Sequence, residues 1–134
     1  MAEHSVFPKK RILVVEDNED LTKTLTFRLR KRGFQVLIAE DGRKGLTQAK
    51  LELPHLIILD LTLPHLSGEE VCKAIRESDN DNLRNIPIIM LTAKRSEVDR
   101  IVGKVIGATS YLTKPYNPTE LFKEIDTHLQ LDAA

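Results

Sequence analysis

Four short apolar runs recur along the chain, and each of them ends at polar or charged residues. The first three contain almost no polar residue, which is typical of parallel strands that are buried on both faces of a sheet. A fifth candidate strand, 34–39, follows Gly33 and has the character of an edge strand. The four apolar runs span residues 12–15, 56–59, 86–91 and 111–112.

Segments with helical periodicity and cap residues lie between the apolar runs. Ser67 and Glu70 form a capping box, and Asn117 stands directly before a proline, so both positions predict the start of a helix. Gly33 and Gly107 predict helix ends, because glycine readily adopts the left-handed conformation that closes a helix. The inward positions of the five expected helices are Leu21, Leu25 and Leu29; Leu46 and Ala49; Val71, Ala74 and Ile75; Val98, Ile101, Val102 and Val105; and Leu121, Ile125 and Leu129.

The alternation of strands and helices predicts an α/β fold, a parallel sheet with helices on both faces. With 134 residues the chain has the length of one domain, which we expect to span 1–134, with its core at about 10–131 and no output domain. Hydrophobic residues make up 41% of the chain, enough for an ordinary core. Cys72 is the only cysteine, which excludes a disulfide framework, and we expect it in the core. The polar run 78–85 predicts a surface loop.

Basic and acidic side chains number 20 each, so the formal net charge is zero. This balance argues against a basic face for nucleic acids or anionic membranes. No apolar run approaches the length of about 20 residues that spans a bilayer, and residues 1–11 contain no apolar signal segment. We therefore expect a cytoplasmic protein with neither a nucleic-acid nor a membrane partner.

Charged and hydroxyl side chains directly follow four of the predicted strands. Ligands of open parallel α/β sheets bind beyond the carboxyl ends of the strands, so these side chains should share one crevice. Three carboxylates this close repel one another, and a hard divalent cation relieves the repulsion. Oxygen ligands without a histidine or cysteine cluster favour Mg²⁺, and the whole set suits phosphoryl transfer. The residues are Glu16, Asp17, Asp60, Thr92 and Lys114.

Each of these residues also has an ordinary structural interpretation. An aspartate at the end of a strand most often caps a helix or forms a turn. Thr92 could cap the next helix, and Lys114 could be a solvated lysine. Their joint occurrence at one edge of the sheet is what favours chemistry. The histidines are scattered, which favours surface or packing roles over phosphotransfer; they are His4, His55, His65 and His128.

Several motifs together resemble the receiver domains of bacterial two-component response regulators, including the chemotaxis regulators. The resemblance covers about residues 10–131 and implies a flavodoxin-like, doubly wound five-stranded parallel sheet with strand order 2-1-3-4-5 and five helices. The matching motifs are Ile12-Leu13-Val14-Val15-Glu16-Asp17-Asn18, Asp60-Leu61-Thr62-Leu63-Pro64 with Ser67-Gly68, Leu91-Thr92-Ala93, and Gly107-Ala108 followed by Tyr111-Leu112-Thr113-Lys114-Pro115.

The resemblance implies roles for the acidic residues. Asp60 would be the phosphoacceptor and would also bind Mg²⁺. Asp17 would bind the ion directly, and the backbone carbonyl of Thr62 would complete the protein ligands. Glu16 would act through water or as a support.

The resemblance also implies a conformational switch. Thr92 and Lys114 would bind phosphoryl oxygens, and Tyr111 would change its rotamer with the position of Thr92. Ala93 would leave room for the phosphoryl group, and the peptide bond from Lys114 to Pro115 would be cis. The implied partners are a sensor histidine kinase or phosphotransfer protein, which supplies the phosphoryl group, and a downstream protein target.

Three alternatives remain beside this interpretation. A degenerate receiver would bind partners constitutively, although every position that carries chemistry is filled. A dehalogenase-type phosphatase would need a second acid where Thr62 stands, and a flavodoxin would need a phosphate loop in place of the acidic residues 16–19. In the favoured interpretation, the chain is not an enzyme beyond its own phosphoryl transfer and dephosphorylation.

The resemblance extends, with departures, to receivers that carry a winged-helix DNA-binding domain and dimerise through charged pairs. Thr109 and Ser110 replace the usual acidic pair, Val105 replaces an acid, and Glu124 replaces a basic residue. We therefore expect a mainly monomeric, stand-alone regulator that acts by protein contact. A piece of a longer regulator would have the same sequence.

Overall fold

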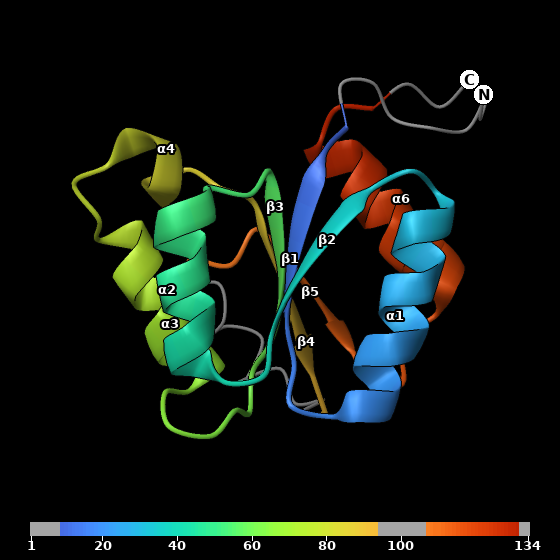
Figure 1. Cartoon of the computed structure of the whole chain (residues 1–134), viewed down its shortest axis with the longest axis horizontal. Coiled ribbons are helices and arrows are strands. Elements are labelled where there is room, and N and C mark those ends of the chain that lie inside the picture. Colours follow the sequence, from blue (N-terminus) through green and yellow to red (C-terminus); the bar gives the residue numbers. More distant parts are fainter. Residues whose placement is uncertain (1–8, 94–106, 132–134) are drawn as a thin grey trace.

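The computed structural model describes residues 9–93 and 107–131. Figure 1 shows a twisted sheet between two layers of helices, with α1 and α6 on one face and α2, α3 and α4 on the other. The strands are β1 (Arg11–Val15), β2 (Gln35–Ala39), β3 (Leu56–Asp60), β4 (Ile88–Thr92) and β5 (Ser110–Thr113). The helices are α1 (Glu19–Lys31), α2 (Gly42–Glu52), α3 (Gly68–Arg76), α4 (Asp81–Arg84) and α6 (Pro118–His128).

All strand pairs are parallel, and the sheet order is β2-β1-β3-β4-β5. This confirms the α/β class and the strand order implied by the resemblance. The central strands β3 and β4 are buried at every residue, as the continuous apolar runs predict. The edge strands β2 and β5 are only partly buried, which confirms the edge character of the segment after Gly33.

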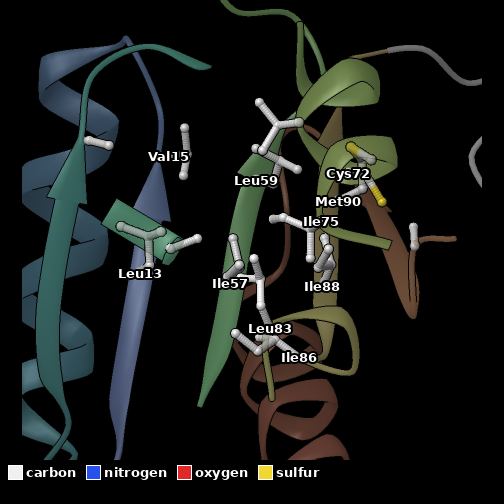
Figure 2. Packing of buried hydrophobic residues seen from close by; sticks show 14 of the residues in the cluster. Leu13, Val15, Ile57, Leu59, Cys72, Ile75, Leu83, Ile86, Ile88 and Met90 are labelled. Atoms are coloured by element: carbon white, nitrogen blue, oxygen red, sulfur yellow. The ribbon is translucent and has the colours of Figure 1, made fainter. Parts of the chain in front are cut away.

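Buried side chains form two clusters on opposite faces of the sheet. The first cluster, drawn in Figure 2, joins the sheet to α2, α3 and α4 and includes Leu13, Ile57, Ile75 and Met90. The second cluster joins the sheet to α1 and α6 through residues such as Leu25 and Ile125. Burial of each such side chain contributes about 1.5–3 kcal/mol to the free energy of folding, so both helix layers are stably packed on the sheet.

The helix ends follow the predicted caps. The capping box of Ser67 and Glu70 is present at the start of α3, and Asn117 caps α6. Gly33 follows α1 with a φ of 96°, in the left-handed region that glycine adopts at low cost. Cys72 is fully buried in the first cluster, as expected, whereas Ala74 is only half-buried.

One sequence prediction is wrong: the polar run 78–85 is not simply a loop. Asn80 caps the short helix α4, and Leu83 is buried in the first cluster with 2% exposure. A four-residue helix shows no periodicity, so its single apolar residue could not reveal it. The helix expected between Ser96 and its predicted end at Gly107 falls on residues 94–106, which lie outside the described residues; Gly107 itself has a φ of 99°. No helix in the described part of the chain is both long and apolar enough to cross a membrane.

Candidate active site

The carboxyl ends of four neighbouring strands bring the predicted residues to one edge of the sheet. Glu16 directly follows β1, Asp60 ends β3, Thr92 ends β4, and Lys114 directly follows β5. The parallel register aligns these ends, because Asp60 pairs with Leu91 on the neighbouring strand. The predicted residues therefore lie at one edge of the sheet.

Three carboxylates converge at this edge. Glu16, Asp17 and Asp60 each offer an oxygen atom within 4.8 Å of the others. Glu16 and Asp60 are buried, with exposed fractions of 4% and 5%, whereas Asp17 is exposed to solvent. Two buried anions and one exposed anion thus share a small volume.

Lys114 supplies a positive charge to this cluster. Its Nζ lies 2.9 Å from Oε1 of Glu16 and 3.3 Å from Oδ2 of Asp60. Burial alone lowers the pKa of Lys114, but the hydrogen bond to Glu16 and the charge of Asp60 outweigh burial and raise it, so the ammonium stays charged. Burial raises the pKa of Glu16, while its hydrogen bonds from Lys114 and the amide of Asn18 oppose the rise.

Asn18 links the start of α1 to the acidic cluster, a role that the sequence motif did not reveal. Its backbone N–H donates to Oε2 of Glu16 over 3.1 Å, and its side-chain Oδ1 accepts from the N–H of Leu21 over 3.0 Å. The same residue therefore caps α1 and orients a buried carboxylate.

A close approach of α3 shapes the loop after Asp60. The N–H of Gly68 donates to the carbonyl of Leu61 over 2.9 Å, and the N–H of Thr62 donates to Oδ1 of Asp60 over 3.3 Å. A Cβ atom at Gly68 would lie 2.2 Å from the carbonyl oxygen of Asp60. Only glycine fits at this position, so Gly68 positions the Asp60 loop, which the motif alone did not show.

The remaining predicted residues lie along β4 and β5. Thr92 is buried with 5% exposure, and its carbonyl accepts from the N–H of Lys114 over 2.7 Å. Tyr111 is half-buried, pairs with Met90 and packs against the first cluster. The peptide bond between Lys114 and Pro115 is cis, as the resemblance implied.

The histidines of the described residues lie outside the acidic cluster. Nδ1 of His55 accepts from the backbone N–H of Arg11 over 2.9 Å, and Nε2 of His128 lies 3.2 Å from Oε1 of Glu124. These contacts are the packing and surface roles that the sequence favoured.

The donor chemistry of the cluster fits Mg²⁺. Its ligand atoms are all carboxylate oxygens, and three carboxylates with one ammonium leave an excess of negative charge. The open, solvent-facing member is Asp17, so a cation with retained water ligands can approach from that side. A cation, a buried carboxylate and an ammonium group together can stabilise a transferring phosphoryl group.

A groove of about 580 Å³ adjoins the cluster on the α1 side. Lys114 and Asn18 stand at its boundary with the acidic residues, and Arg28 and Tyr116 also line it. Burial raises the pKa of Tyr116, so its phenol stays neutral.

Comparisons with known proteins agree with this geometry. The response regulator receiver domain family matches residues 12–126. The Bacillus subtilis alkaline phosphatase synthesis transcriptional regulatory protein PhoP is 44% identical over 112 residues, which are 84% of this chain and 45% of that protein. The chain spans about half the length of the curated relatives that it matches.

Two solved structures are similar over most of their length. The receiver domain of sensor histidine kinase PA1611 from Pseudomonas aeruginosa, with a magnesium ion in its active site cleft, has a TM-score of 0.82 and 31% identity, covering 91% of this chain and 98% of that one. The Saccharomyces cerevisiae Ssk1 receiver domain, solved with the phosphotransfer protein Ypd1, gives a TM-score of 0.81 and 36% identity, with coverage of 91% and 90%. The chain therefore belongs to the response regulator receiver domain family, whose members are phosphorylation-activated switches of two-component signalling.

Proposed function

We propose that Asp60 is the residue of this chain that accepts the phosphoryl group. The observation that carries the proposal is the position of its carboxylate, buried among Glu16, Asp17 and Lys114 at the carboxyl edge of the sheet. One oxygen of Asp60 forms a bond to phosphorus while the bond between phosphorus and the donor breaks. The ammonium of Lys114, 3.3 Å from Asp60, offsets charge on the phosphoryl oxygens.

The acidic cluster supports Mg²⁺ as the cofactor of this transfer. Asp17, Asp60 and the carbonyl of Thr62 would hold the ion, and Glu16 would support them from its buried position beside Asn18. When bound, the ion offsets the negative charge that carboxylates and phosphoryl oxygens accumulate. Thr92 ends the neighbouring strand and contributes a hydroxyl group at the same edge.

The output of the switch runs through β4 and β5. An aspartyl phosphate adds negative charge and strong acceptors, which attract the hydroxyl of Thr92. Movement of Thr92 alters the space beside Tyr111, which is half-buried and packed against the first cluster. A downstream protein would then bind the altered surface of β5.

The phosphodonor is a sensor histidine kinase or a phosphotransfer protein. The groove beside Lys114 and Asn18 supports this choice, because Lys114 lines it and also contacts Asp60, so a protein docked there would lie against the side chains that border the acidic cluster. The similarity to Ssk1, which was solved with Ypd1, supports the same class of partner. A receiver that binds its partners constitutively is the second candidate.

Labelling by acetyl phosphate tests the proposal. We expect Mg²⁺-dependent label on the wild type, none on Asp60→Asn, and wild-type labelling of Asp79→Asn, a matched change at an exposed aspartate. Thr92→Ala should still be labelled but should lose the amide NMR response of β5 to beryllofluoride. Label of undiminished intensity on Asp60→Asn would refute the assignment, and an unlabelled but folded wild type would favour the constitutive receiver.

A further inference from the structure

Arg76, the last residue of α3, joins two distant segments through its guanidinium group. Nε donates to the carbonyl of Gly107 over 2.8 Å, and one terminal nitrogen donates to the carbonyls of Arg84 and Ile86 over 2.8 and 2.7 Å. The other terminal nitrogen donates to Oγ1 of Thr109 over 3.3 Å. One side chain therefore ties the segment that enters β4 to the segment that enters β5.

Thr109 completes this connection. Its N–H donates to the carbonyl of Ile88 over 2.8 Å, and its Oγ1 accepts from the N–H of Ile88 over 2.9 Å. These two reciprocal hydrogen bonds join Ile88, the first residue of β4, to the residue that precedes β5. Because Oγ1 of Thr109 also accepts from Arg76, the guanidinium and the two hydrogen bonds between Thr109 and Ile88 form one network.

The network is closely fitted and contains no anion. Arg76 is half-buried, and no carboxylate of the described residues forms an ion pair with it, so carbonyl and hydroxyl oxygens alone receive its N–H groups. Gly107 has a φ of 99°, and a Cβ atom there would lie 2.7 Å from Cγ of Arg76. With its five N–H donors the guanidinium holds these four oxygens together, whereas methionine at position 76 would offer no donor.

The opposite end of β5 belongs to the phosphorylation site. There the N–H of Lys114 donates to the carbonyl of Thr92. β5 is only four residues long, half-buried throughout, and pairs with β4 alone within the described part of the sheet. Side chains on both of its faces are packed, Tyr111 against the first cluster and Leu112 against the second, so its register is set and Arg76 fixes the end opposite the phosphorylation site.

We propose that Arg76 is a positioning residue of the switch, which fixes the segments that enter β4 and β5 so that phosphorylation is read out by side chains along β5 and not by a displacement of the whole strand. The proposal rests on the proposed switch through Thr92 and Tyr111. With that end fixed, a pull on Thr92 is taken up by Thr113, with which it pairs, and by the side chain of Tyr111. Without the guanidinium, the segment that enters β5 also yields, and the same pull is spread over a longer stretch of the chain.

Amide NMR with beryllofluoride and Mg²⁺, together with acetyl phosphate labelling, tests the proposal. Arg76→Met should be labelled at the wild-type rate, because Arg76 lies at the other end of the strands, yet its shift changes at residues 111–113 should fall to about half or less. Arg76→Lys should restore part of the response. Lys73→Met, on the exposed side of the same helix, is the matched control and should respond as wild type.

A smaller perturbation covers the case in which Arg76→Met does not fold. Thr109→Val removes the shared hydroxyl and should weaken the response, whereas Thr109→Ser keeps the hydroxyl and should preserve it. Thr109→Val replaces the hydroxyl by a methyl group, Thr109→Ser removes only the methyl group, and both leave Arg76 in place.

Three results of these experiments would contradict the proposed role of Arg76. A wild-type response in folded Arg76→Met or in Thr109→Val would overturn the proposal. Parallel loss of labelling and response in Arg76→Met would also overturn it, because the role would then be general folding. If the wild type itself shows no response at β5, the proposed switch fails and this inference with it. The two failures are distinguishable: in the first, the wild type shows no shift changes at β5, and in the second, wild type and Arg76→Met show equally large ones.

Discussion

Replacement of Lys114 by methionine should destabilise the protein mainly when Mg²⁺ is absent. The ammonium lies 2.9 Å from Glu16, whose side chain is only 3% exposed, and it also contacts Asp60. Loss of one partner from a buried ion pair costs about 3–5 kcal/mol, whereas an exposed pair contributes about 0–1 kcal/mol. Since the Lys114 side chain is 24% exposed, we expect an intermediate loss. Its size should be about 2 kcal/mol, or about 6–10 °C in Tm.

Thermal unfolding in EDTA and in excess Mg²⁺ measures this effect. Mg²⁺ can replace the lost positive charge, so the difference in Tm between Lys114→Met and wild type should shrink when the ion is added. Lys44→Met is the matched control, because Lys44 also pairs with a glutamate, Glu40, but both side chains are more than half exposed. Equal losses of Tm for the two variants in EDTA, or a difference that Mg²⁺ leaves unchanged, would show that the ammonium does not offset buried charge.

Three further predictions follow from other parts of the structure. Gly68→Ala should lower Tm and slow labelling, because its Cβ would meet the carbonyl of Asp60 at 2.2 Å; unchanged labelling at an unchanged Tm would contradict the close approach. Burial lowers the pKa of His55, so its contribution to stability is complete above a pH of about 6.5 and is lost as pH falls through the folded pKa. In urea unfolding, the free energy of unfolding should therefore fall less between neutral and low pH for His55→Asn than for wild type. An identical pH profile of the two proteins would count against a lowered pKa of His55. Sedimentation velocity should show a mainly monomeric protein with and without beryllofluoride, since Thr109 and Ser110 supply no acidic pair and Glu124 would repel an acid of a second copy. Dimer formation on activation would reject this expectation.

The sheet and its acidic edge were predictable because both depend on local patterns. Each central strand is a continuous apolar run, and the chemistry-bearing residues stand directly at its carboxyl end, as Asp60 does after Leu59. In a parallel sheet this arrangement is enough to bring them together. The roles of single residues came from the resemblance rather than from the pattern.

The contacts that position the site were not predictable in the same way. Arg76 binds carbonyl oxygens 8 to 31 residues away, and a backbone carbonyl leaves no mark in the sequence. Gly68 looks like an ordinary residue of a capped helix start until the carbonyl of Asp60 is placed against it. Helix α4 was missed because one buried leucine in a polar run carries no periodic signal.

The core is separated into two clusters, and the proposed output through Tyr111 and the proposed docking groove of the phosphodonor belong to different ones. Tyr111 packs against the first cluster, whereas Tyr116 packs against the second and lines the groove proposed for the phosphodonor. The two clusters share the backbone of the central strands but bury different side chains. With the donor in the proposed groove, we expect substitutions in the second cluster to change the choice of donor while the surroundings of Tyr111 stay the same. Changes of input and of output specificity can accumulate independently in such a domain.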